Sequence, residues 1–135
     1  MKLWDFFRPP DRNEIAKWAH KEKLTPPERG QLNQKLDMLE RLGFDTAWGL
    51  DFLDGPVRHQ GLNQRHVYKL VIHAGRQLRP MLCRGPLAES EMTLLCGAFE
   101  KDGEFDPWDA PTRAEQNRQI ILEQNEAGNG VSNFT

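Results

Sequence analysis

Three short runs decide the fold: HVYKLVI (66–72), QLRPMLCR (77–84) and EMTLLCGAF (91–99). Each has the length of a β-strand, and turn residues follow the first two at Ala74-Gly75 and Gly85-Pro86. In the first run, Tyr68, Leu70 and Ile72 fall on one face. The third run is almost wholly apolar, which indicates a strand in the centre of a sheet. The spacing therefore predicts three neighbouring strands that form a meander.

A helix is expected before these strands, over residues 12–23. Ile15, Trp18 and Ala19 recur at helical spacing, so one face of this helix is apolar. Asp11 precedes the periodic residues and is a suitable N-cap. The helix should therefore begin just after the prolines at positions 9 and 10.

A second helix is expected over residues 26–42. Thr25 and Glu28 form the pattern of a capping box, and Gly43 follows the last helical residue. One apolar stripe runs along this helix and should be buried against the sheet: Leu32, Leu36, Leu39 and Leu42. Because only a short joint separates the two helices, they are expected to form a hairpin.

The remaining segments complete the predicted order of elements. They are a first strand over 3–7, a loop over 44–56, a loop over 102–107, and a last helix from Pro111 or Thr112 to about Gln124. Pro80 lies within the second of the three runs, which predicts an edge or a bulge there.

This order predicts an α+β fold, in which an antiparallel meander sheet of about four strands carries an N-terminal helical hairpin on one face and a C-terminal helix. The second face of the sheet should be more polar, with Lys69 and Arg79 on it. We expect a single domain over 1–125 and a flexible tail over 126–135, which is rich in Gly, Asn and Ser.

Length and composition suit one globular domain in a reducing cytoplasm. The chain has 135 residues, of which 38% are hydrophobic, and two cysteines. Cys83 and Cys96 are expected to be buried free thiols on paired strands. No run of 18 apolar residues occurs and no secretory signal is apparent, so no association with a membrane is expected.

The net charge of −2 hides two blocks of opposite sign. Residues 57–84 carry six arginines or lysines and no carboxylate, whereas residues 89–115 carry eight carboxylates and two cations. A basic surface of this kind can bind a polyanion such as RNA. The alternative is that the acidic block neutralises it, through pairs from Arg79 and Arg84 to Glu100, Asp102 or Glu104.

Several kinds of chemistry have no support in the sequence. It has no clustered His or Cys at metal-ligand spacing and no glycine-rich nucleotide motif, so neither a metal nor a cofactor is expected. Ser90 and Ser132 are the two serines, and both lie in predicted loop or tail positions. RNA cleavage without a metal stays open, because it needs an acid, a base and cations that stabilise the phosphate charge.

Three segments resemble the RelE/ParE toxin superfamily, and most closely its HigB-like, phage-derived branch. They are Val67–Ile72, Leu78–Pro86 and Thr93–Lys101. The last of these is similar to a Leu-Leu-His-Gly-Phe-x-Lys-Lys run of that branch. The resemblance covers residues 30–122 and implies a RelE-like fold.

The resemblance also implies a function, namely the toxin of a type II toxin-antitoxin system that cuts translated mRNA on the ribosome. Its protein partner would be a cognate antitoxin. By position, Arg79, Lys101 and Arg84 are the expected catalytic residues. The remaining cations of the basic block are the expected RNA contacts: Arg58, Arg65, Lys69 and Arg76.

The sequence departs from that pattern at several positions, and these departures keep a second function open. Val71, Cys96, Ala98 and Glu100 stand where the branch has Arg, His, Phe and Lys. A toxin-like protein that has lost its nuclease activity fits these residues as well. Such a protein would bind a host protein, including by an action like that of gyrase inhibitors.

Overall fold

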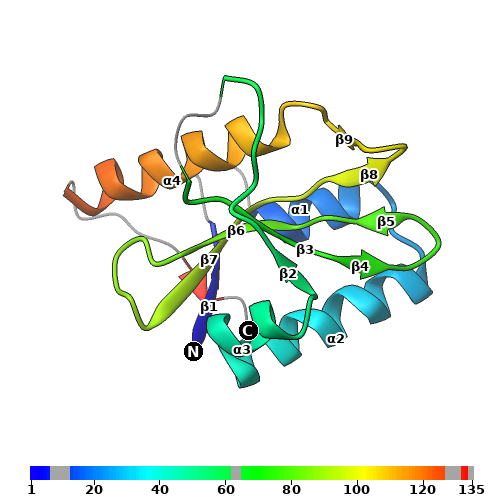
Figure 1. Cartoon of the computed structure of the whole chain (residues 1–135), viewed down its shortest axis with the longest axis horizontal. Helices are drawn as coiled ribbons and strands as arrows, with labels where there is room; N and C mark the ends of the chain where they lie inside the picture. Colours follow the sequence, from blue (N-terminus) through cyan, green and yellow to red (C-terminus); the bar gives the residue numbers. More distant parts are fainter. Residues whose placement is uncertain (7–12, 62–64, 127–131, 134–135) are drawn as a thin grey trace.

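The computed structural model describes residues 1–6, 13–61, 65–126 and 132–133. Its helices are α1 (Glu14–Lys21), α2 (Pro26–Leu42), α3 (Phe44–Gly49) and α4 (Ala110–Glu126). Its strands are β1 (Lys2–Asp5), β2 (Leu53–Asp54), β3 (Tyr68–Leu70), β4 (Ile72–His73), β5 (Gln77–Leu78), β6 (Met81–Arg84), β7 (Glu91–Cys96), β8 (Phe99–Lys101), β9 (Glu104–Asp106) and β10 (Ser132–Asn133). Figure 1 shows α4 on one side of the strands and α2 with α3 on the other.

The strands form two hydrogen-bonded sheets, in the orders β10-β1-β7-β6-β3-β2 and β4-β5-β8-β9. The α+β class is confirmed, and β3, β6 and β7 form the predicted antiparallel meander with β7 inside the sheet. The prediction of a wholly antiparallel sheet is wrong, because β1 pairs with β7 in parallel. The helical hairpin leads the chain away from β1 and supplies the long connection that a parallel pair requires.

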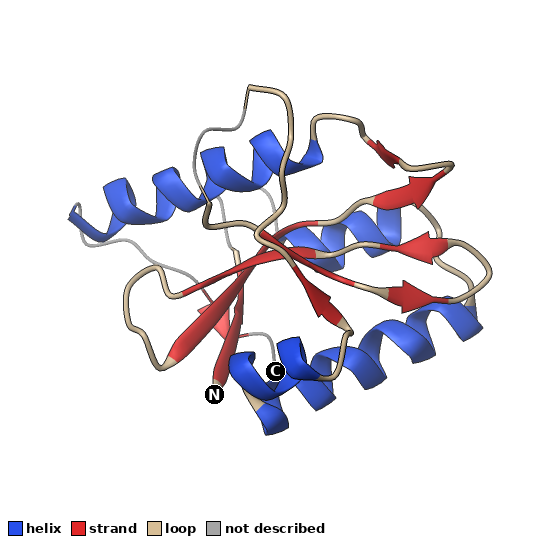
Figure 2. Ribbon diagram, viewed as in Figure 1, coloured by secondary structure: helices blue, strands red, loops and turns tan. Residues whose placement is uncertain are grey.

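Each of the three predicted strands is interrupted, and the interruptions lie side by side. They fall at Val71, at Arg79–Pro80 and at Gly97–Ala98. The backbone joins them, since Leu70 N donates to Pro80 O at 2.8 Å and Arg79 N donates to Ala98 O at 2.8 Å. The three strands therefore bend together, and the four-stranded sheet continues the larger one in a new direction (Figure 2).

Gly97 makes this bend compatible with the packing of α1. A Cβ atom at residue 97 would lie 2.0 Å from Cδ2 of Trp18, so the indole of α1 rests directly on the glycine backbone. Trp18 also packs against Phe99, with ring centroids 5.1 Å apart. A side chain at residue 97 would displace the indole from the sheet.

The helices α1 and α2 cover one face of the sheet. Leu32, Leu36 and Leu39 of α2 are buried there, as the stripe predicted, and together with Leu70, Leu82 and Leu94 they belong to the larger of two apolar clusters. Leu42 is 38% exposed, so its predicted burial is wrong. It is the last residue of α2, and the chain turns away at Gly43, whose φ is 85°.

The second face was predicted to be polar, and where α4 covers it this is wrong. Met81, Cys83 and Leu95 of the sheet pack with Ala114 and Ile121 of α4 in a second apolar cluster. Both faces of the central strands are therefore buried.

The start of α1 is capped from the sheet. Its N-cap is Asn13, which makes no side-chain cap, whereas the buried carboxylate of Asp5 accepts from the backbone N–H groups of Ile15 at 3.0 Å and Ala16 at 3.3 Å. Burial raises the pKa of Asp5 to about 7. The helix is shorter than the predicted 12–23. The predicted N-cap Asp11 lies outside the described residues.

Two predicted loops contain regular structure. Residues 44–56 include α3 and β2, and residues 102–107 include β9, which pairs with β8. The β8–β9 turn has Asp102 and Gly103 at φ 54° and 81°, the conformation that an Asp-Gly pair favours in tight hairpins. The last helix begins at Ala110, so Thr112 lies inside it.

The C-terminal residues also differ from the predicted tail. Ser132 and Asn133 form β10, which pairs with β1, so the expectation of a free tail is wrong for these two residues. The β1 edge of the sheet is therefore covered by the last part of the chain that the structure describes.

Both cysteines are free and buried, as predicted, and their strands β6 and β7 are paired. Burial raises the pKa of each thiol to about 12. Cys96 Sγ donates to Ala110 O at 3.4 Å, which links the sheet to the first turn of α4. Among the helices of the described chain, none combines the length and apolar character needed to cross a membrane.

Candidate functional site

Five side chains from neighbouring strands form a row across the bent end of the sheet: Asp54, Lys69, Arg79, Glu100 and Phe105. Asp54 on β2 is the register partner of Lys69 on β3, and Glu100 on β8 is that of Phe105 on β9. Arg79 lies between them, at the interruption before β6. We call this set the cross-strand row. Residues 54 and 105 come together only through the order of the strands.

Glu100 is the centre of the cross-strand row. Its Oε1 accepts from Arg79 Nε at 2.7 Å and from Lys69 Nζ at 3.2 Å. In the described part of the chain, both hydrogen bonds of Glu100 go to Oε1, which leaves Oε2 without one, and the side chain is 22% exposed. Burial acts to raise the pKa of Glu100, but the hydrogen bonds from Arg79 and Lys69 outweigh it and hold the pKa below its ordinary value. Glu100 is therefore ionised at neutral pH, with one oxygen fixed and the other open.

Arg79 was expected on an RNA-binding surface, with pairing to Glu100, Asp102 or Glu104 as the alternative. The structure shows the pair with Glu100, and only 7% of Arg79 is accessible. Its Nη1 donates to Leu78 O at 2.9 Å, while Nε holds Glu100. The guanidinium therefore reaches Glu100 of β8 and a backbone carbonyl instead of solvent. Arg79 therefore fixes the position of Glu100 and is a positioning residue.

A cavity of about 310 Å³ lies beside the row. It is lined by Asp54, Gly55, Pro56, Val57, Arg58, Lys69, Glu100, Gly103 and Phe105. Lys69 Nζ is 3.8 Å from Asp54 Oδ2 and 5.1 Å from the centre of the Phe105 ring. The cavity therefore combines two carboxylates, Asp54 and Glu100, with two cations and an aromatic ring.

Arg76 was predicted to contact RNA, but it serves the fold. Its Nε and Nη2 bind Glu28 Oε2 and Oε1, both at 2.9 Å, and its guanidinium lies 4.3 Å from the Phe99 ring centre. Glu28 also completes the capping box of α2 with Thr25, as predicted. The hydrogen bond from Arg76 lowers the pKa of Glu28 to about 2. This ion pair ties the β4–β5 turn to the start of α2.

The other predicted cations do not join the cross-strand row, apart from Arg58 in its cavity. Arg65 and Arg84 line a different cavity, beside Trp48 of α3. Arg84 Nη1 lies 3.5 Å from Asp45 Oδ1. Lys101 is exposed at the end of β8, opposite Glu104 in the hairpin register. The seven predicted residues therefore occupy four separate places. Arg58, Lys69 and Arg79 lie near the row, and Arg65 and Arg84 lie beside α3. Arg76 lies in the β4–β5 turn against the start of α2, and Lys101 lies at the β8–β9 hairpin.

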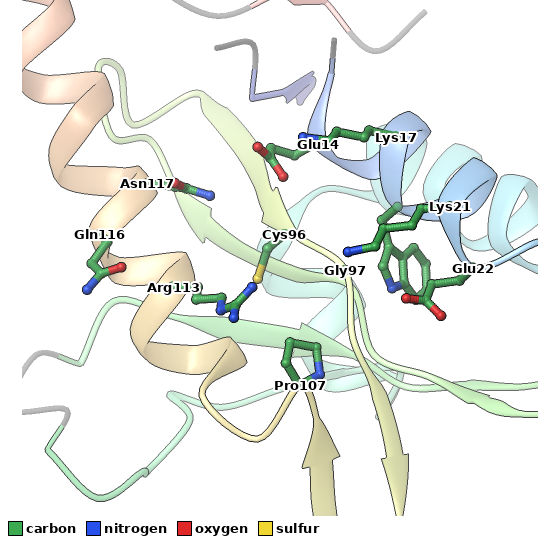
Figure 3. Close-up of a pocket in the computed structure, with 11 residues that line it drawn as sticks. Glu14, Lys17, Lys21, Glu22, Cys96, Gly97, Pro107, Arg113, Gln116 and Asn117 are labelled. Atoms are coloured by element: carbon green, nitrogen blue, oxygen red, sulfur yellow. The ribbon is translucent and has the colours of Figure 1, made fainter. Parts of the chain in front are cut away.

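A further cavity of about 380 Å³ lies between α1 and α4, and Figure 3 shows the side chains around it. Cys96 and Gly97 line it from the sheet, and Lys21, Glu22 and Arg113 line it from the two helices. The Cys96 thiol is a poor nucleophile, because burial raises its pKa to about 12. Cys96 therefore supplies no activated nucleophile to this cavity.

The sequence suggested two interpretations of Glu100, as the replacement of a lysine of the resembling family and as a possible partner of Arg79, and the structure shows the pair with Arg79. One signal was available. Phe99 belongs to the apolar face of its strand, so alternation put Glu100 on the face already predicted for Lys69 and Arg79. In the described part of the chain, no three His, Cys, Asp or Glu side chains lie close enough together to hold a metal ion.

Comparison of the chain with models of protein families, with curated proteins and with solved structures found no match. The chemistry of the cross-strand row therefore has to carry the functional argument.

Proposed function

We propose that the chain is a toxin-like endoribonuclease, similar to the RelE/ParE toxins, that cleaves RNA without a metal at the cross-strand row. The observation that carries the proposal is the geometry of Glu100. Two cations hold its Oε1, and Oε2 is free beside a cavity of about 310 Å³. An ionised carboxylate in this position can act as a general base, and because the pKa of Glu100 is lowered it is a weaker base than an unpaired carboxylate.

The reaction assigned to this site is attack by the ribose 2′-hydroxyl on the neighbouring phosphate. Glu100 Oε2 takes the 2′-hydroxyl proton, the 2′-oxygen bonds to phosphorus, and the bond from phosphorus to the 5′-oxygen breaks. The products are a 2′,3′-cyclic phosphate and a free 5′-hydroxyl. Among the described residues that line the cavity none is a histidine, and in the reaction assigned here the leaving oxygen takes its proton from water. The missing general acid should slow cleavage by about 10²–10⁴-fold.

The other members of the site have separate roles. Lys69 and Arg58 line the cavity and supply positive charge to the phosphate. Phe105 offers an aromatic surface on which a base can stack. Arg79 is a positioning residue, because it reaches Glu100 and not the cavity. Arg84 and Lys101, which the resemblance made catalytic, have no part in this reaction.

The resemblance supplies the biological setting of the proposal. The substrate would be translated mRNA in the cytoplasm, and a small antitoxin would be the protein partner. The RelE-like fold belongs to this proposal as well, with the three-stranded meander and the two-helix hairpin as its support.

The test compares Glu100→Gln with a matched control, Glu104→Gln, on the same β8–β9 hairpin. Glutamine keeps the length of the side chain but cannot take the proton. Cleavage of a fluorescent RNA oligonucleotide, and growth arrest on expression, should fall at least 100-fold for Glu100→Gln and stay unchanged for the control. Equal cleavage by the wild type and Glu100→Gln would refute the assignment of the base.

A second function is favoured by the same ion pairs. Glu100 neutralises part of the charge of Arg79 and Lys69, which leaves less positive charge to hold RNA. In that case the chain is a non-enzymatic protein that binds a host protein. The wild type would then cleave no RNA, and wild type and Lys69→Ala would bind an RNA oligonucleotide equally weakly at low salt.

A further inference from the structure

A second site of interest lies beside α3, on the side of the sheet that the helical hairpin covers. It is a cleft of about 400 Å³ between α3, the residues before β3, and β6, and we call it the Trp48 cleft. The indole of Trp48 is 55% exposed, although tryptophan is usually largely buried. Two more rings line the cleft, Phe44 and Tyr68, which pack edge to face with centroids 4.7 Å apart.

Two arginines stand next to these rings. Arg84 Nη1 lies 3.5 Å from Asp45 Oδ1, and both side chains are largely exposed. Arg65 is exposed and makes no ion pair within the described chain. An exposed ion pair contributes little, so a ligand carboxylate can readily replace Asp45 at Arg84. The cleft therefore offers two guanidinium groups beside a large apolar surface.

We propose that the Trp48 cleft binds an acidic, leucine-containing segment of a protein partner. Tryptophan, tyrosine and arginine are the residue types that contribute most to protein–protein binding when they gather in one place. Carboxylates of the partner would pair with Arg65 and Arg84, and an apolar side chain would pack on Trp48. Leu50, which is 56% exposed just after α3, extends the apolar surface.

The charges around the cleft favour an acidic protein over RNA. Asp45 and Asp51 flank Trp48 on its two sides, in this cleft and in the adjoining cavity. A nucleic acid carries a negative charge on every nucleotide, and these carboxylates would repel it. A peptide can place its few carboxylates opposite the arginines and its leucines elsewhere.

The proposal does not depend on the ribonuclease activity. Tyr68 points to the face of β3 that the larger apolar cluster occupies, whereas its neighbour Lys69 points to the cross-strand row. The cleft and the row therefore lie on opposite faces of the sheet. A partner in the Trp48 cleft would leave the row cavity open.

The probe is a labelled 12-residue peptide of alternating Glu and Leu, with a Gln/Leu peptide of the same length as its uncharged control. Binding is measured by fluorescence anisotropy on the full chain. Trp48→Ala is compared with Trp108→Ala, the other strongly exposed tryptophan, and Arg65→Glu with Arg58→Glu, which changes the row cavity. Thermal unfolding confirms that each variant is folded.

We expect the Glu/Leu peptide to bind at least tenfold more weakly to Trp48→Ala and Arg65→Glu than to the wild type, with no change in the two controls. The Gln/Leu peptide should bind at least tenfold more weakly than the acidic one. The proposal is overturned by absent binding or by equal binding to all variants. It is also overturned if an RNA 12-mer binds and loses affinity in the same two variants.

Discussion

Replacing Arg79 by alanine is the most direct test of how the cross-strand row is built. An arginine exposed on an RNA-binding sheet face, which was one of the two alternatives that the sequence left open, would leave the melting temperature almost unchanged on removal. In the structure its side chain is 9% exposed and bonded to Glu100 at 2.7 Å. Its removal leaves a partly buried carboxylate with Lys69 as its one remaining cation.

The expected loss follows from this geometry. Removing one partner of a buried ion pair costs about 3–5 kcal/mol. Glu100 is 22% exposed and keeps its contact with Lys69 at 3.2 Å, so we expect a smaller loss of about 2–3 kcal/mol in the free energy of unfolding. For a domain of this length, that lowers the melting temperature by roughly 8–12 °C.

The assay is urea unfolding at pH 7 of the wild type, Arg79→Ala, Glu100→Gln and the double variant of these two positions. The double variant should recover part of the loss, because glutamine leaves no buried charge behind. Arg41→Ala is the control, since it breaks an exposed pair with Asp37 and should cost less than about 0.5 kcal/mol. An Arg79→Ala variant as stable as this control would refute the reasoning.

Two further predictions concern the fold. Gly97→Ala should destabilise the protein by about 1–3 kcal/mol, because the Cβ of the alanine would lie 2.0 Å from a ring atom of Trp18. Urea unfolding measures this loss. An unchanged free energy of unfolding would contradict the packing of Trp18 on residue 97. The free energy of unfolding should also pass through a maximum at about pH 4–5. Glu28 has its pKa lowered from 4.5 to about 2, so its contribution is present above pH 4.5 and lost as the pH falls toward 2. Asp5 has its pKa raised from 3.8 to about 7, so stability falls as the pH rises through that range, and Asp5→Asn should remove this alkaline slope.

The sequence by itself determined the elements whose signals are local. The capping box of Thr25 and Glu28 and the leucine spacing that follows place α2 at the predicted residues 26–42. The apolar run at 91–99 correctly indicated a strand inside the sheet. These predictions succeed because helix caps, helical periodicity and strand burial depend on residues a few positions apart.

The tertiary structure decided which side chains meet. Sequence alone separates Arg79 from Glu100 by 21 residues and cannot tell whether the guanidinium reaches solvent or a carboxylate. The pairing of β5 with β8 settles this, because it brings Arg79, which follows β5, beside Glu100 of β8. The same sheet order divides the basic block of residues 57–84 between the cross-strand row, the Trp48 cleft and the α2 contact. Charge is counted along the chain, but the field that a ligand meets depends on which strands are neighbours and which face each side chain takes.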